Sequence, residues 1–314
     1  MTKRKNTITF KKQSFTKDTF TGVIMTSAER IQAILLTAIA PTVWGSTYIV
    51  TTELLPADSP LLASAIRALP AGLLLIAYTR CFPNQQWWGK LACLGTLNIG
   101  LFFYCLFFAA SYLPGGTAAL VMSSQPIIVM LLSGLVLKSK IALSHCIAAI
   151  FGVLGVALIV INETVQISAQ GIVLAVLGTL SMASGVVLTK YWGRPENMST
   201  LAFTGWQLLV GGILLLPAAL WFEGLPETIS LKNLAGYSYL TIVGAVLAYA
   251  LWFKGIERLP ATNVAFLGFL SSVSASVLGY VFLDEILTPL QLLGAGAILV
   301  SIFLASHSPK AANA

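Results

Sequence analysis

The side chains in this sequence that could recognise a small molecule are polar and aromatic groups set inside long apolar stretches. Trp44-Gly45-Ser46-Thr47-Tyr48 lies about halfway along the first stretch. A polar group that faces hydrocarbon is costly, so such side chains face a neighbouring helix or a cavity. Trp44 and Tyr48 are therefore candidates to line a binding cavity, with helix packing as the alternative. Gly45 and Ser46 fit packing better, because small residues let helices approach closely.

Arg67 is the one ionisable residue well inside an apolar stretch. It lies some seven residues from the start of the second stretch, shallow enough for its guanidinium to snorkel to the interface. An ion pair with Glu53 or Asp58 would then fix the first two helices. The alternative is an anchor for an anion or carboxylate, because a planar guanidinium suits bidentate recognition. The sequence leaves both roles open.

The third and eighth stretches add a second group of polar and aromatic residues. Asn98 and Tyr104 lie deep in the third stretch and are candidate cavity residues. Tyr249 and Trp252 lie near the end of the eighth stretch, where aromatic side chains are usually interfacial anchors.

The fourth and ninth stretches are each weakened at the same relative place. Ser124 and Gln125 directly precede Pro126, which removes a backbone donor and predicts a kink. Ser271 and Ser272 occupy the corresponding place in the ninth stretch. Polar, weakened helices at equivalent places in two halves indicate a central binding site, and serine-mediated packing is the alternative.

Composition requires that these residues sit in a membrane. With 57% hydrophobic and 9% charged residues, the chain cannot be an ordinary soluble globule. About 20 apolar residues cross a bilayer as a helix. We predict an all-α integral membrane fold with ten spans, at residues 31–52, 60–80, 89–110, 116–137, 143–161, 170–190, 200–221, 235–254, 261–283 and 288–306.

The spans form two copies of a five-helix unit. At an offset of 140 residues, Gly45 falls on Gly185, Gly72 on Gly212 and Arg67 on Gln207. An odd number of spans inverts the second copy, as in alternating-access transporters. Gln207, beside Trp206, is then expected at the mirrored depth of Arg67, at the opposite gate. The predicted units are a basic extension 1–30, a first repeat 31–161, a second repeat 170–306 and a tail 307–314.

Charge predicts the orientation of the chain. If both ends are cytoplasmic, all but two of the 18 basic residues lie on the cytoplasmic side; the exceptions are Lys232 and the embedded Arg67. The net charge of +7 is therefore a topology signal that gives no reason to expect nucleic acid as a partner. Membrane lipids are the expected partner of the basic N-terminal extension, although translation could also start at Met25.

Catalysis and cofactors find no support in the sequence. The two histidines, His145 and His307, have no second ligand at helical spacing. A glycine-rich phosphate loop is absent from the sequence, so ATP-driven transport by this chain alone is not expected. We expect no enzyme activity, no metal and no cofactor.

Four segments resemble one transporter family. They are Val43-Trp44-Gly45-Ser46-Thr47, residues 65–75, Leu259-Pro260-Ala261 and residues 278–291. Together they resemble the drug/metabolite transporter superfamily, specifically its EamA-type ten-helix exporters, and look most like the branch linked to pigment and amino-acid-metabolite efflux. The resemblance implies two five-helix bundles with substrate held between them, helices 1–4 and 6–9 as the wall, and cytoplasmic termini. Lys138-Ser139-Lys140 departs from the family, which usually has an acidic residue before the fifth helix.

These observations predict a secondary transporter of a bacterial inner membrane that exports small amphipathic metabolites, such as amino-acid derivatives or aromatic compounds. The expected mechanism is alternating access, and a homodimer is left open. A membrane-embedded sensor or assembly subunit that binds a ligand without moving it is the alternative. The residues expected to bind substrate are Trp44, Tyr48, Arg67, Asn98, Tyr104, Ser124, Gln125, Trp206, Gln207, Ser271 and Ser272.

Overall fold

A computed structural model describes residues 25–56, 59–113, 115–160, 168–283 and 286–307, and every regular element in these ranges is helical. Within them, nine rods are long and apolar enough to cross a membrane. The helix α1 (Ser27–Leu54) has 28 residues. At 1.5 Å per residue it is about 42 Å long, more than the hydrocarbon thickness of about 30 Å. With α1, the fold is the predicted all-α bundle of ten rods.

Six of the ten rods are single helices, and four are interrupted. The other single helices are α2 (Pro60–Thr79), α7 (Leu143–Val160), α8 (Ala169–Trp192), α9 (Thr200–Phe222) and α14 (Pro289–Ser306). The third rod comprises η1 (Gln85–Trp87), α3 (Trp88–Gly95), η2 (Thr96–Gly100) and α4 (Leu101–Tyr112). The fourth comprises α5 (Gly115–Met122) and α6 (Gln125–Val136). The eighth comprises α10 (Leu231–Thr241), η3 (Ile242–Leu247) and α11 (Ala248–Arg258), and the ninth α12 (Ala261–Leu267) and α13 (Leu270–Phe282).

Local signals explain where the rods begin. The side chains of Thr26, Ser199, Ser230 and Thr288 each accept a hydrogen bond from the third residue of the helix that follows. Such N-caps satisfy backbone donors that have no partner inside the helix. All rod ends fall within about four residues of the predicted spans, which is the usual accuracy of boundaries read from sequence.

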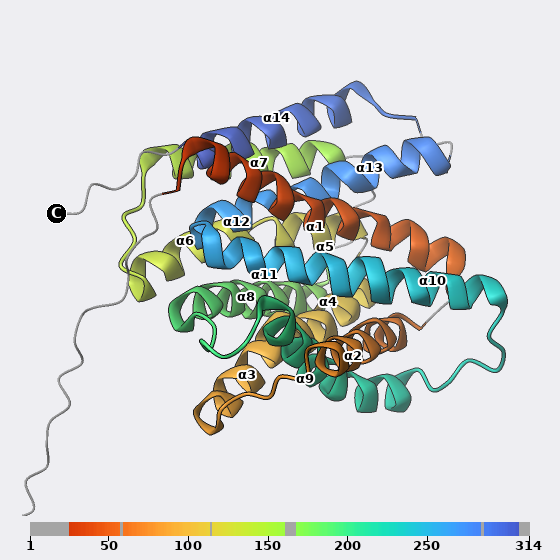
Figure 1. Ribbon diagram of the computed structural model, residues 1–314. Coiled ribbons are helices and arrows are strands. Elements are labelled where there is room, and N and C mark those ends of the chain that lie inside the picture. The colour runs from red at the N-terminus through yellow and green to blue at the C-terminus, as the bar shows by residue number, and fades with distance from the viewer. Residues whose placement is uncertain (1–24, 57–58, 114, 161–167, 284–285, 308–314) are drawn as a thin grey trace, which may run out of the picture.

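The rods pack with an internal two-fold relation. The second rod, α2, lies along its counterpart α9, and the fifth rod, α7, lies along its counterpart α14. Figure 1 shows these two pairs at opposite edges of the bundle. Between them, α4 and α6 pack on α8, while their counterparts α11 and α13 pack on α1. Each half therefore uses its first rod to hold the third and fourth rods of the other half.

The contact between α2 and α9 is a close backbone approach. A Cβ atom on Gly72 would lie 2.5 Å from the backbone nitrogen of Leu209, and one on Gly212 would lie 2.7 Å from the Cα of Leu69. Such distances are below van der Waals contact, so only glycine lets these helices approach this closely. The two repeat-equivalent glycines thus hold the two halves together.

The two ends of the bundle differ in charge. We call the end with Arg80 and Arg258 the basic end and the end with Glu53 and Glu223 the acidic end; they lie at the left and right of Figure 1. At the acidic end, the Glu223 carboxylate accepts hydrogen bonds from the backbone nitrogens of Leu61 (2.8 Å) and Leu62 (2.7 Å). This carboxylate caps α2 from α9, and so ties the two halves together at that end.

At the basic end, polar contacts join α8 and the loop after it to α11. Arg194 and Glu257 form the one ion pair of the described ranges, at 2.7 Å. The Lys190 ammonium donates to the last carbonyls of α11, those of Ile256 (2.9 Å) and Glu257 (2.8 Å). A cation at a helix C-terminus is favourable, so these contacts stabilise the end of α11.

Glu223 predicts a pH dependence of stability. Burial raises the pKa of its carboxyl above the usual value, and the two backbone donors oppose this only in part. A carboxyl whose pKa is higher in the folded state stabilises the fold most below its unfolded pKa, and this contribution is lost as pH rises through the folded pKa. We expect the Tm of the wild type, minus that of Glu223→Gln, to fall as the pH rises above about 4, the ordinary pKa of a glutamate. Thermal unfolding in detergent measures this difference; a difference that rises with pH would contradict the assignment.

Candidate functional site

Two rods change helix type at matching places near their middles. The segments η2 in the third rod and η3 in the eighth rod are both π-helical. Such segments are rare and occur frequently at functional sites. At the offset of 146 residues that aligns Leu113 with Leu259, Asn98 of η2 corresponds to Gly244 of η3. Each half therefore places one π-helical segment at the same position of its third rod.

Gly244 joins the first, second and eighth rods. Its carbonyl oxygen accepts hydrogen bonds from Nε1 of Trp44 at 3.0 Å and from Nη2 of Arg67 at 3.2 Å. These two side chains, which are separate in the sequence, therefore meet at one backbone atom. Trp44 is half-buried and Arg67 is 4% exposed.

Aromatic rings surround this point. The Trp44 ring lies 4.9 Å from that of Tyr249 and 5.1 Å from that of Trp252, measured between centroids. Tyr249 and Trp252 are each 1% exposed, so the prediction that they are interfacial anchors is wrong. Their side of α11 packs against α1, and this contact buries them. We call Trp44, Arg67, Phe103, Gly244, Tyr249 and Trp252 the central cluster.

The guanidinium of Arg67 lies deeper than its distance from the helix end predicts. It lies over the Phe103 ring, 4.9 Å from the centroid, and is buried within the bundle. It makes no ion pair with Glu53, which is exposed, while Asp58 lies outside the described residues. The neighbouring rods explain the burial: α4 supplies Phe103, and α10 lies against α2, where Thr241 donates to the Ile66 carbonyl at 3.2 Å.

The second half repeats this contact without a charge. Asn98 is fully buried, and its Nδ2 donates to Oε1 of Gln207 at 2.8 Å and to Oγ1 of Thr189 at 3.1 Å. Gln207 and Arg67 are repeat counterparts, and each bonds to the π-helical segment of the other half. The sequence therefore aligned two residues that make equivalent contacts, but only the first contact carries a formal charge.

Trp206 lies apart from the central cluster. Its Nε1 donates to the Cys81 carbonyl at 2.9 Å, and its ring packs on Trp88 (4.8 Å) and Phe82 (5.6 Å). Cys81 and Phe82 directly follow α2, so this tryptophan packs near the basic end. The structure does not bring it together with Trp44.

The interruptions in the fourth and ninth rods are filled by serine hydroxyls. Helix α5 ends at Met122, and α6 begins at Gln125, with buried Pro126 in its first turn, where a proline costs no hydrogen bond. Ser124 donates to the Val121 carbonyl at 2.7 Å, and Gln125 is half-buried.

In the ninth rod the break falls between α12 and α13. There Ser271 donates to the Gly268 carbonyl at 2.9 Å, and the Ser272 carbonyl accepts from Ser276 at 3.1 Å. A Cβ on Gly45 would lie 2.6 Å from the Ser271 carbonyl oxygen. The broken ninth rod thus lies directly against the residue that follows Trp44.

Two further candidates lie outside this contact set. Tyr104 is half-buried, and its ring lies 4.6 Å from that of Phe108. The side chain of Tyr48 lies outside the described residues.

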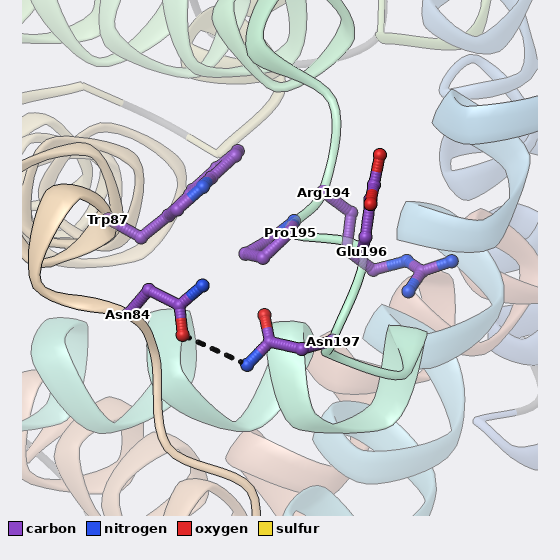
Figure 2. A pocket seen from close by; sticks show the side chains of 6 residues that line it. All are labelled: Asn84, Trp87, Arg194, Pro195, Glu196 and Asn197. Atoms are coloured by element: carbon purple, nitrogen blue, oxygen red, sulfur yellow. Dashed lines mark hydrogen bonds between the residues drawn. The ribbon is translucent and has the colours of Figure 1, made fainter.

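A cavity of about 460 Å³ opens at the basic end, and its lining includes none of the predicted site residues. Figure 2 shows Asn84 and Asn197 facing each other there, with a hydrogen bond of 3.2 Å. The lining residues come from the loop after α2, from η1 and from the loop after α8: Asn84, Trp87, Arg194, Pro195, Glu196 and Asn197. No pattern in the sequence marked these loops, because polar loop residues are common at membrane surfaces.

Comparisons with known proteins agree with this geometry. The model of the EamA-like transporter family matches residues 31–161 and 169–307. Protein PecM of Dickeya dadantii is 49% identical over 84% of this chain and 89% of its own length. The uncharacterized transporter sll0355 of Synechocystis is 29% identical over 86% of this chain and 88% of its own length.

A solved structure shares the fold. A protein crystal structure aligns with a TM-score of 0.75 at 19% identity, covering 88% of this chain and 96% of that chain. At this identity the likeness concerns the fold alone. The family match, the PecM relative and the ten-rod bundle with its two-fold relation lead to one conclusion: this chain is a multi-pass membrane transporter that belongs to the EamA-like transporter family.

Proposed function

We propose that this protein is a secondary transporter that exports small metabolites, such as amino-acid derivatives or aromatic compounds, across a bacterial inner membrane. The observation that carries the proposal is the central cluster, where one charged and several aromatic side chains from four rods of both repeats converge. Polar side chains in a membrane bundle mark substrate pathways, and aromatic rings suit an organic cargo.

Alternating access follows from the repeat arrangement. The first rod of each half holds the third and fourth rods of the other half, so movement of one five-rod unit changes the contacts of both π-helical segments. At the acidic end, the hydrogen bonds from the first turn of α2 to the Glu223 carboxylate join the two halves. We propose that this cap opens and closes as the units rock.

The charge pattern supports an orientation with the basic end in the cytoplasm. The loops after α2 and α8, which line the cavity of Figure 2, would then face the cytoplasm. Export would require cargo to enter from that side.

The test is a metabolite profile of cells and medium. We expect at least one small organic compound to accumulate in the medium when the gene is overexpressed and inside cells when it is deleted. A Gly72→Leu variant, in which the seam between α2 and α9 is blocked, serves as the inactive control. Profiles that do not differ between wild type and this control would reject export.

A further inference from the structure

Buried hydrogen-bond donors without acceptors gather at the central cluster. Among the described residues, Nε of Arg67 and Nε1 of Trp252 are buried and have no hydrogen-bond partner. Oγ1 of Thr47, one turn after Trp44 on α1, is likewise buried without a partner. The two nitrogens can only donate, and the hydroxyl can do so. A site that has surplus donors matches a ligand group that has surplus acceptors.

The charge of Arg67 points the same way. Among the described residues, Arg67 donates one hydrogen bond, to the Gly244 carbonyl, which also accepts a hydrogen bond from Trp44. Over the described ranges, the one ion pair is that of Arg194 and Glu257 at the basic end. Arg67 therefore has no carboxylate partner there. A buried cation is costly unless an anion compensates it. The ring of Phe103 compensates only in part, because a cation–π contact is weaker than a buried ion pair.

The position of Gly244 beside this cation would accept one added methyl group without a clash. A Cβ on buried Gly244 would meet nothing closer than Leu240 Cδ2 at 3.7 Å and Arg67 Nη2 at 4.0 Å. At Gly72 and Gly45, by contrast, a Cβ would lie within 2.6 Å of backbone. Unlike Gly72 and Gly45, Gly244 is therefore not required for a close backbone approach, and an added methyl group there would lie next to the guanidinium.

We propose that the cargo carries a carboxylate, which binds the guanidinium of Arg67 next to Gly244. The apolar part of the cargo lies against the rings of Trp44, Tyr249 and Trp252. A carboxylate is planar and singly charged, so it neutralises one guanidinium, whereas a doubly charged phosphate would leave a net negative charge in the bundle. The inference rests on the proposed function and names its substrate class: aromatic or other apolar organic acids.

Gln207 explains why the second half lacks such a site. The amide of Asn98 uses Gln207 as its acceptor, so the equivalent position is neutral and already bonded. One carboxylate per transporter is therefore expected, bound on the Arg67 side of the two-fold relation.

The test compares acids with their amides on the full-length protein in detergent. The probes are benzoate, phenylacetate and indole-3-acetate, each paired with its neutral amide, and sodium chloride at equal concentration. Ligand-dependent shifts of Tm give the affinities, since a ligand that binds the folded state raises Tm. We expect acids to bind about tenfold or more tightly than their amides, because charge-assisted hydrogen bonds have about that effect.

Two variants and one control locate the effect. Arg67→Gln should abolish the preference for acids, and Gly244→Ala should weaken acid binding about tenfold, because it adds a methyl group beside the guanidinium. Gly134→Ala is the matched control, because its added Cβ would meet its nearest atom at 3.6 Å, far from the central cluster; it should bind acids as the wild type does. If Arg67→Gln does not fold, Gly244→Ala decides.

The inference is overturned if acids and amides bind equally, if the preference survives Arg67→Gln, if Gly244→Ala binds acids normally, or if chloride stabilises the protein as acids do. Failure of the proposed function is recognised separately. An exported compound without a carboxylate would overturn this inference and leave export standing. A preference for acids without any exported compound would uphold the site and reject export.

Discussion

Gly72→Ala will destabilise the folded protein by about 3 kcal/mol, the upper part of the usual range for overpacking. The added Cβ would lie 2.5 Å from the Leu209 backbone nitrogen and 2.8 Å from the Gly205 carbonyl oxygen. A crowded side chain can change rotamer, but backbone atoms of a packed helix cannot move away without shifting the whole helix. The expected result is a lower Tm in detergent and less folded protein in the membrane.

Gly134→Ala is the matched control for this prediction. It adds the same methyl group to a helix of the same bundle, where the nearest atom is 3.6 Å away. Since alanine is a better helix former than glycine by about 1 kcal/mol, this change should be neutral or stabilising. Equal stability of the two variants would show that α2 and α9 are not closely packed.

The sequence was sufficient to predict the ten rods. Long apolar stretches have one stable form in a bilayer, because every backbone group must be satisfied within the segment. The alignment of Gly72 with Gly212 marked both halves of the seam between α2 and α9, and that of Arg67 with Gln207 marked two equivalent contacts. The repeat offset along the chain was enough to predict these pairs, because equivalent residues of two similar helices lie at equivalent places in the fold.

The π-helical segments could not be predicted. Thr96–Gly100 and Ile242–Leu247 contain no proline and no charge, and nothing in their sequences distinguishes a π-helix from an ordinary α-helix. What distinguishes them is the contacts of their backbone with other rods, such as those of the Gly244 carbonyl with Trp44 and Arg67. Those contacts join residues that lie 200 and 177 positions apart in the chain.

The depth of Arg67 was misjudged for a related reason. Distance from a helix end gives depth in the membrane only if no other rod covers that end. Here Phe103 of α4 and the rod that begins with α10 cover it. Tyr249 and Trp252 are buried because α11 lies on α1, and neither helix carries a signal for the other in its sequence.

Loss of the Trp44 side chain is expected to remove most of the export activity. Trp44→Ala deletes the ring that contacts Tyr249 and Trp252 and the donor that binds the Gly244 carbonyl. The cargo would lose an aromatic contact, and Gly244 would lose one of its two side-chain donors. We expect export to fall at least about tenfold, which corresponds to about 1.4 kcal/mol of lost transition-state or binding energy.

Two further tryptophan variants separate this effect from simple loss of a large side chain. Trp221→Ala removes an indole that is 84% exposed on the lipid or interface side, so export should be unchanged. Trp44→Phe keeps the ring contacts and loses only the donor to Gly244, so it should retain an intermediate rate. Rates are measured as release of the compound that the metabolite profile identifies, divided by the amount of folded protein in the membrane. If Trp44→Ala and Trp221→Ala then export equally well, the central cluster does not bind the cargo. If Trp44→Phe is as inactive as Trp44→Ala, the hydrogen bond to η3 matters more than the aromatic surface, because that bond is what the two variants both lack.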